Sequence, residues 1–421
     1  MGLGRKLVVI AGVAAVANVA SAQQKVTGPV AVYWMSAATQ TGFGMPGAGG
    51  AGGRPDSRAM MNAMMGGGAG AANKTLMLQL GSGQTNPAPA ADHLPPQGLG
   101  AGPDLPLVSP KVVPTEPVER GPEIPREYQK PRGKMLIFWG CGEHARPGQP
   151  VVIDFATMSN NPTAAMAAFK GIDVRPMNPP AAYRYKGYGE WPNERTQTTV
   201  PSNGSLVGQH TIRGNYSPQI NFSLDEDQDF LGALNLTTNA KAAGGWVNLG
   251  WNLVGNAEAY LATAVGGNGE TVVMWSSSET QSAGFAMPDY LSGGDITRLV
   301  ANKTLMGPTT RTCNVPKEVL DAMPQGLVQM VAYRGEANFV YPPKPADPKV
   351  AWNQQWTVKV RYRSATGGLL GMAMPQMPGR TGAYPVPPSA ENPAPQQPGQ
   401  PPRKPKASDI LKGLGGLPFP R

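Results

Sequence analysis

The sequence predicts an all-β protein with a few short helices, built as two related β-sandwich-like units with long disordered segments. Apolar runs are short, rich in β-branched and aromatic residues, and bounded by glycine, proline and asparagine turns, as in sheets. Glycine and proline contribute 54 and 45 of the 421 residues, which is well above their usual share and indicates extensive loops. An internal repeat indicates that the β-structure is present in two related copies.

The first residues form an export signal. Arg5 and Lys6 precede an apolar run that is followed by Ala20-Ser21-Ala22, the small residues that a signal peptidase requires. We therefore expect a signal peptide over 1–22 and an exported protein, periplasmic or extracellular. No later stretch approaches the roughly 20 apolar residues of a membrane-spanning helix, so no transmembrane segment is expected after cleavage.

Composition narrows the function classes. Three histidines and two cysteines are too few for a zinc-rich or disulfide-framework protein. The formal charge of +9 would suggest nucleic acid for a cytosolic protein. Export excludes nucleic acid as the expected partner and makes an anionic component of the cell envelope the more accessible one.

Three stretches lack the periodicity of packed elements: 44–72, 81–132 and 371–421. The last is a basic, proline-rich tail that favours extended, disordered chain and could act as a tether. We expect a first β-unit over 23–160, with insertions at 44–72 and 81–132. A connecting β-rich region over 161–235 follows, and then an immunoglobulin-like second unit over 236–370, which precedes the tail.

Four runs have the character of strands: 134–139, 151–155, 271–275 and 356–362. In the last, Lys359, Arg361 and Arg363 alternate with apolar residues, which predicts a half-buried antiparallel strand with one wet, basic face. Two short helices are expected as well. Asp295 could cap one that carries Ile296, Leu299 and Val300, and Pro316 could open another that carries Val319, Leu320 and Met323.

The repeat has three anchors in the same order. Trp34 begins WMSAATQTGFGMP and Trp275 begins WSSSETQSAGFAMP, NKTLM occurs at 73–77 and 302–306, and Gly133 and Gly326 each open an apolar strand. Met60, Met61, Met64 and Met65 lie between the first two anchors of the first copy. The second copy has the apolar stripe of the predicted helix at 295 between the same anchors. We therefore interpret the methionines as a helix stripe rather than a copper site, and no cofactor is expected.

The segment GWVNLGWNLVGNAEAYLATAVGGNGETVVMW, residues 245–275, resembles the B, C and C′ strands of a fibronectin type III or immunoglobulin-like sandwich. In that pattern a strand ending in tryptophan, here Trp251, precedes a turn and a tyrosine, here Tyr260. The resemblance implies a β-sandwich. The whole chain is also similar to uncharacterised exported bacterial proteins, which implies no activity.

Cys141, Glu143 and His144 lie on one loop after a predicted strand. They could form a cysteine nucleophile with its base, or part of a metal site. A shared turn is the stronger interpretation, because Glu143 has a counterpart in Glu336 whose neighbours include neither cysteine nor histidine. We therefore expect no catalytic residue. If the protein is an enzyme, Cys141, Glu143 and His144 are the candidates.

Cys141 and Cys313 are the only cysteines in the sequence, and pairing is the default in an oxidising compartment. A disulfide between them would tie the two units together across a 172-residue loop and stabilise the fold by about 5 kcal/mol at most. The alternative is two buried, reduced thiols.

Asp225, Asp227 and Asp229 have a spacing that could converge on calcium, but the glycine and glutamate of an EF-hand loop are missing. We therefore favour a solvated acidic turn and expect no metal. His93 lies in the predicted linker and needs no role, and His210 is expected on a strand, at the surface or with its hydrogen bonds satisfied.

Tyr183, Tyr185, Tyr188 and Trp191 are interleaved with basic residues and could stack on sugars, although aromatic residues in β-proteins more often pack a sheet. Together these patterns predict an exported, non-enzymatic protein that binds an anionic envelope or extracellular component or a glycan. The alternatives are a secreted hydrolase that uses the Cys141 loop and a structural envelope component.

Overall fold

The structure is a computed structural model that describes residues 24–42, 72–111, 133–155, 174, 176–196, 198–281 and 287–372. The predicted signal peptide, the paired methionines and the tail from residue 373 lie outside the described residues. Within the described ranges, no helix is long and apolar enough to cross a membrane.

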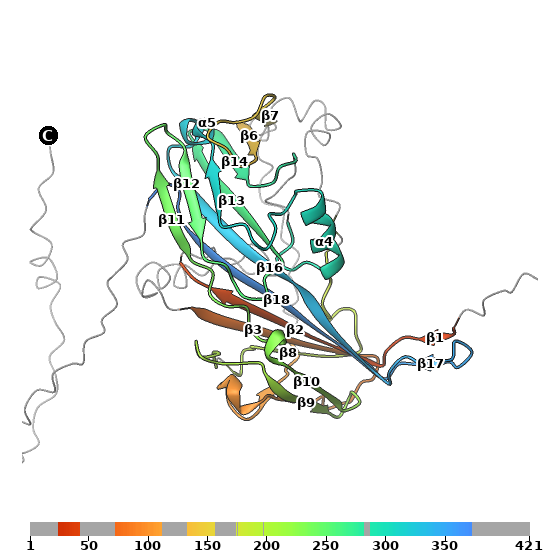
Figure 1. The fold of residues 1–421 in the computed structure, drawn as a ribbon. Helices are drawn as coiled ribbons and strands as arrows, with labels where there is room; N and C mark the ends of the chain where they lie inside the picture. The colour runs from red at the N-terminus through yellow and green to blue at the C-terminus, as the bar shows by residue number, and fades with distance from the viewer. Residues whose placement is uncertain are drawn as a thin grey trace, which may run out of the picture. The chain divides into compact units, whose positions relative to one another are not determined.

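A mixed nine-stranded sheet is the central element of the fold (Figure 1). Its strand order is β7-β6-β14-β13-β16-β18-β2-β3-β8. Two neighbouring pairs, β14 with β6 and β18 with β2, run parallel, and the other pairs are antiparallel. The strands span Ala31–Gln40 (β2), Asn73–Ser82 (β3), Lys134–Trp139 (β6), Val151–Asp154 (β7), Gly187–Trp191 (β8), Ala259–Asn268 (β13), Thr271–Ser276 (β14), Gly326–Tyr341 (β16) and Trp356–Leu369 (β18).

Three smaller sheets and four short helices complete the described structure. The four-stranded sheet contains Ile220–Leu224 (β10), Gly208–Gly214 (β9), Ala91–Leu94 (β4) and Leu105–Pro106 (β5). The three-stranded sheet contains Leu236–Lys241 (β11), Val247–Trp251 (β12) and Thr312–Val315 (β15), and the two-stranded one Val26–Thr27 (β1) and Trp352–Asn353 (β17). The helices are Gln97–Leu99 (η1), Glu226–Gln228 (η3), Gly293–Ala301 (α4) and Lys317–Ala322 (α5).

One face of the nine-stranded sheet forms the main core. Tyr33 and Met35 on β2 and Val360 on β18 are fully buried there. They belong to a single apolar cluster with residues of the four-stranded and three-stranded sheets, such as Ile212 and Leu249. Both small sheets therefore cover the same face of the large sheet.

The opposite face is covered in part by α4. Ile296 and Leu299 on the helix pack with Leu261 and Val331 of the sheet. The predicted helix is confirmed, but its N-cap is Ser292, whose hydroxyl accepts a hydrogen bond from the amide of Asp295. A serine side chain is short enough to reach an amide in the first turn, which makes it a common cap.

The strands and helices that the sequence predicted by residue range are present. The strands predicted at 134–139, 151–155, 271–275 and 356–362 correspond to β6, β7, β14 and β18, and α5 begins directly after Pro316. The segment 81–132 was wrongly predicted to lack packed elements, because its described part contains β4, η1 and β5 with Leu99 and Leu105 fully buried. Prolines interrupt any periodicity there, so tertiary pairing rather than local pattern determines its structure.

The two predicted units do not form two separate sandwiches. The strands β2, β3 and β6 of the first unit share one sheet with β13, β14, β16 and β18 of the second. The repeated NKTLM also differs in structure: Asn73 opens β3, whereas Asn302 caps the end of α4. The duplication itself stays a prediction.

The strands of residues 245–275 lie in two different sheets. The strand β12 lies in the three-stranded sheet, and the next two strands, β13 and β14, lie in the nine-stranded sheet. Trp251 at the end of β12 contacts Tyr260 on β13, with ring centroids 5.9 Å apart. The chain therefore crosses from one layer to the other between these two aromatic residues.

Candidate functional site: a basic–aromatic face of the large sheet

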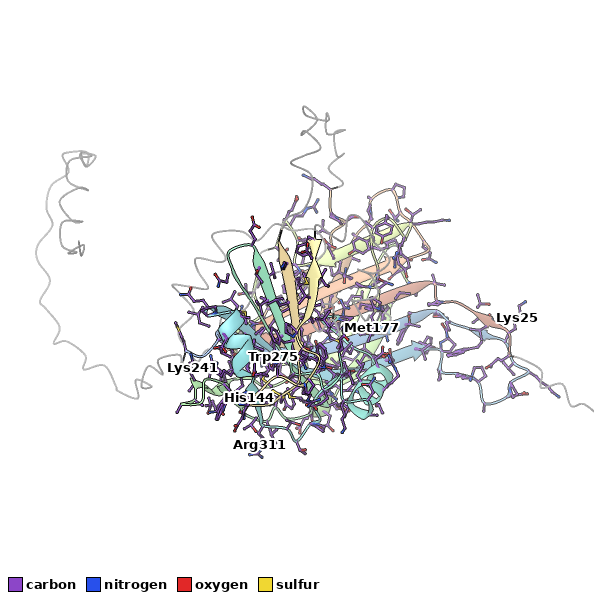
Figure 2. The ribbon with its side chains drawn as sticks, turned by 90° about the horizontal axis from the view of Figure 1, so that it is seen from above. Lys25, His144, Met177, Lys241, Trp275 and Arg311 are labelled. Carbon is purple, nitrogen blue, oxygen red and sulfur yellow. A yellow bond between two sulfur atoms is a disulfide. The ribbon has the colours of Figure 1, made fainter. Side chains whose placement is uncertain are left out.

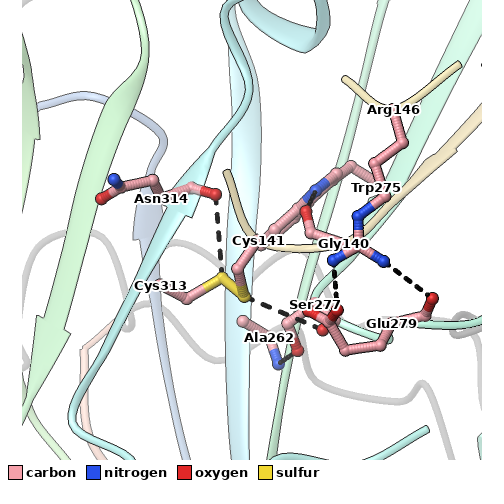
Figure 3. Close-up of a disulfide and its surroundings, with 9 residues drawn as sticks. All are labelled: Gly140, Cys141, Arg146, Ala262, Trp275, Ser277, Glu279, Cys313 and Asn314. Carbon is pink, nitrogen blue, oxygen red and sulfur yellow. Dashed lines mark hydrogen bonds and ion pairs between the residues drawn. A yellow bond between two sulfur atoms is a disulfide. The ribbon is translucent and has the colours of Figure 1, made fainter. Parts of the chain in front are cut away.

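The predicted Cys141 loop contains a disulfide. Cys141 follows β6 and is bonded to Cys313 on β15, with a Cα–Cα distance of 5.2 Å (Figure 3). The bond joins the nine-stranded sheet to the three-stranded one. In this bonded form Cys141 has no thiol, so the loop supplies no cysteine nucleophile.

The other residues of this loop fasten it to α5. His144, labelled in Figure 2, is hydrogen-bonded to Glu318 at 2.9 Å, and the amide of Ala145 donates to the same carboxylate at 2.8 Å. Burial favours a higher pKa for Glu318, but the hydrogen bonds from Ala145 and His144 outweigh it and lower that pKa. The carbonyl of Glu143 accepts from the amide of Lys317. These contacts clamp a turn and do not assemble a catalytic group.

The three aspartates are engaged separately. Asp225 is the N-cap of η3 and completes a capping box with Gln228. Asp229 accepts from the hydroxyl of Ser205 and from nearby amides, whereas Asp227 accepts from Asn256. Among the described residues, no group of three or more histidine, cysteine or acidic side chains could hold a metal ion.

The four candidate aromatic residues for glycan stacking do not form one surface. Tyr183 is 81% exposed, but Tyr188 and Trp191 are only 6% and 1% exposed. Tyr188 donates to Glu190 at 2.5 Å and Trp191 belongs to the main core. The stacking interpretation is wrong for Tyr188 and Trp191. Side chains alternate between the two faces of β8, and both of these are buried in the protein.

A buried hydrogen-bonded chain joins the large sheet to the four-stranded sheet. The hydroxyl of Tyr33 on β2 lies 2.6 Å from Nδ1 of His93 on β4, and Nε2 of His93 lies 2.9 Å from Nδ1 of His210 on β9. His210 Nε2 lies 2.7 Å from the carbonyl oxygen of Leu206. All three side chains are fully buried. His93 is therefore a core residue and not the linker residue expected from sequence, and His210 is a satisfied strand histidine.

The partners define the protonation of this chain. The Leu206 carbonyl can only accept, so His210 carries its proton on Nε2 and accepts at Nδ1. His93 then donates from Nε2 and accepts at Nδ1 the proton of Tyr33. Burial lowers the pKa of His210 to about 4, and burial together with the proximity of His210 lowers the pKa of His93 well below its usual value. Both imidazoles are neutral, and their role is to hold the two sheets together.

The basic strip predicted on β18 lies on the α4 side of the sheet. Lys359, Arg361 and Arg363 alternate with Val360 and Tyr362, which face the main core. The strip is confirmed as half-buried, but β18 is not purely antiparallel, because it pairs with β16 on one side and runs parallel to β2 on the other. That parallel pairing places Trp34 directly beside Lys359 and Ser36 beside Arg361.

Two aromatic rings contact the strip. The Lys359 ammonium and the Arg361 guanidinium lie 5.5 and 5.3 Å from the ring centre of Trp34. Arg361 and Arg363 lie 4.3 and 5.4 Å from the ring centre of Tyr290, in the segment before α4. We call Trp34, Tyr290, Lys359, Arg361 and Arg363 the basic–aromatic face. The sequence indicated its cations but not its aromatic residues, because only strand pairing brings Trp34 and Tyr290 to them.

The outer cations are neutralised and the middle one is not. Lys359 pairs with Glu336 at 3.1 Å, and Arg363 pairs with Asp289 at 2.6 Å. Among the described residues, Arg361 makes one side-chain hydrogen bond, from Nε to the hydroxyl of Ser36 at 2.7 Å, and no ion pair. Its burial lowers the pKa of its guanidinium, which the nearby Tyr290 and Asp289 partly oppose.

A cavity of about 410 Å³ adjoins this face. Trp34 and Lys359 line it together with Asn338 on β16 and with Trp352 and Gln354 around β17. Small-molecule sites have volumes of roughly 300–1,000 Å³ and combine aromatic walls with a few polar groups. The lining of this cavity has that composition.

Comparisons with protein-family models, with curated proteins and with solved structures find no match to this chain. The candidate sites therefore rest on geometry and chemistry alone.

Proposed function

We propose that the protein is an exported, non-enzymatic binding protein that takes an anionic envelope or extracellular component on its basic–aromatic face. The observation that carries the proposal is the cavity of about 410 Å³ whose wall includes Trp34 and Lys359, with Arg361 held against the same Trp34 ring. Cations held against aromatic rings are fixed in position, so they lose little entropy when an anion binds.

The charge balance supports an anionic ligand. Three cations and two carboxylates, Glu336 and Asp289, leave one positive charge at the face. The mature chain expected after cleavage is also basic, because the loss of Arg5 and Lys6 leaves 34 basic against 27 acidic residues, and this excess steers anions toward it. The export signal in the sequence and the Cys141–Cys313 disulfide support a location in an oxidising compartment.

The competing hypotheses have less support. A hydrolase would need a free thiol at Cys141, which the disulfide removes. The half-buried Arg361, which makes no ion pair among the described residues, favours a binding protein over a purely structural envelope component.

The test is binding of the mature chain, residues 23–421, to an anionic and a neutral polysaccharide at low salt. Lys359→Gln removes a charge from the cavity wall, and Lys241→Gln removes the same charge from an exposed position on β11. We expect the wild-type protein and Lys241→Gln to bind the anionic polysaccharide alike, Lys359→Gln to bind it more weakly, and none to bind the neutral one. Equal losses in both variants would show attraction by overall charge, and no binding by the wild-type protein would contradict the proposal.

A further inference from the structure

Arg361 is the one cation of the basic strip without a carboxylate partner among the described residues. Transferring a guanidinium into a partly buried position costs free energy unless a counter-charge is supplied. Lys359 and Arg363 receive that counter-charge from Glu336 and Asp289. Arg361 has no ion pair of its own, because the nearby Asp289 is paired with Arg363.

The contacts of Arg361 also fix its orientation. Its Nε donates to Ser36, and Trp34 and Tyr290 lie 5.3 and 4.3 Å from its guanidinium carbon. The two terminal Nη groups are left, and they form a planar pair of donors. A planar pair of N–H donors matches the two oxygens of a carboxylate in a bidentate contact.

We propose that Arg361 binds a carboxylate group and that the ligand of this face is a carboxylate-bearing saccharide of the uronic acid class. This inference rests on the proposed function, since it uses the same face. Arg361 does not itself line the cavity, but it contacts Trp34, which does. The cavity beside Trp34 supplies groups that suit the rest of such a ligand. Gln354 offers an amide to sugar hydroxyls, and Trp352 offers an indole surface for stacking.

The saccharide class follows from this combination. An apolar acid would make no use of the Gln354 amide in the cavity wall, and a neutral sugar would leave Arg361 without a counter-charge. A sulfated saccharide shares the negative charge, and an arginine fork can also bind a tetrahedral oxyanion in a bidentate contact. Dextran sulfate is therefore included in the test as the competing anion.

The experiment compares four probes on the mature chain: oligogalacturonate, its methyl ester, dextran sulfate and dextran. The methyl ester removes the carboxylate charge and keeps the sugar, so it tests the inference on the unaltered protein. We expect the wild-type protein to bind oligogalacturonate at least about tenfold more tightly than its methyl ester, as expected for charge-assisted hydrogen bonds. Dextran should not bind.

Two variants assign the contact to Arg361. Arg361→Lys keeps the charge but loses the planar donors, and Arg311→Gln, at the exposed position labelled in Figure 2, is the control for loss of charge. We expect Arg361→Lys to weaken oligogalacturonate binding about tenfold and Arg311→Gln to leave it near the wild-type value. Thermal unfolding of each variant checks that it folds.

The outcomes separate this inference from the proposed function. If the wild-type protein binds neither anionic polysaccharide, the proposed function is overturned. If it binds both, but equally to the methyl ester or equally after Arg361→Lys, the anionic face stands and the carboxylate assignment is overturned.

Discussion

At the scale of single residues, the hydrogen-bonded chain from Tyr33 through His93 to His210 leaves no unpaired donor or acceptor within it. Tyr33→Phe removes the hydroxyl and leaves Nδ1 of His93 buried without a donor. We expect it to lower the free energy of unfolding by about 1–3 kcal/mol, measured by urea denaturation at pH 7. Tyr183→Phe, at a position 81% exposed, is the matched control and should change little. Equal stability in both variants would show that the chain is not a stabilising feature.

The same residues predict how stability depends on pH. In the unfolded chain a histidine binds a proton near pH 6.5, whereas in the fold burial lowers the pKa of His210 to about 4 and lowers that of His93 as well. The unfolded state therefore binds more protons below pH 6.5, and stability falls as the pH drops from 6.5 toward 4. For His210 this corresponds to about 3 kcal/mol. Denaturation midpoints that stay constant between pH 6.5 and 5 would contradict this, since most carboxylates titrate below that window.

Sequence reasoning at this scale missed what depends on distant partners. His93 lies among prolines, and its place in the core is created by pairing of β4 with β9 and by contact with Tyr33 sixty residues away. Tyr290 likewise reaches Arg361 across 71 positions of sequence. Lys359, Arg361 and Arg363 were predictable, because alternation along a strand is a local property.

At the scale of elements, the disulfide links β15 to the loop after β6 across a sequence separation of 172 residues. Closing so long a loop restricts the unfolded chain, so Cys141→Ala with Cys313→Ala should lower the free energy of unfolding by up to about 5 kcal/mol. The measurement is urea denaturation of the double variant against the wild-type protein. Reduction of the wild-type protein should have the same effect, and a thiol titration should find no free thiol before reduction. Two thiols titrating in the native, unreduced protein would contradict the bond.

Elements were predictable where a local pattern is complete. The run KMLIFW has the same first and last residues as β6, because apolar and aromatic residues bounded by turns favour a strand. The strands β4 and β5 have no such pattern and owe their pairing to the four-stranded sheet.

At the scale of the whole molecule, the arrangement of strands connects the two predicted units. Parallel pairing of β18 with β2, and of β14 with β6, places strands of both units side by side in one sheet. The repeat suggested two units but gave no information on how strands of one unit pair with strands of the other. Only the pairing of strands distant in sequence shows it.

This arrangement predicts one cooperative unfolding transition. Sharing a sheet means that neither unit can lose its strands without exposing the core of the other. Far-ultraviolet circular dichroism and tryptophan fluorescence should therefore follow the same urea transition. Two separate transitions would indicate two independent sandwiches and would contradict the shared sheet.

The central claim is that an anionic ligand binds at the basic–aromatic face, and indole N–H signals in NMR test it most directly. Trp34 and Trp352 line the cavity, whereas Trp275 is 2% exposed, with its indole nitrogen bonded to the carbonyl of Gly140 at 3.0 Å. On titration of the mature chain with oligogalacturonate, the account predicts that the signals of Trp34 and Trp352 shift and that of Trp275 does not. Saturable binding that leaves both Trp34 and Trp352 unchanged would contradict it.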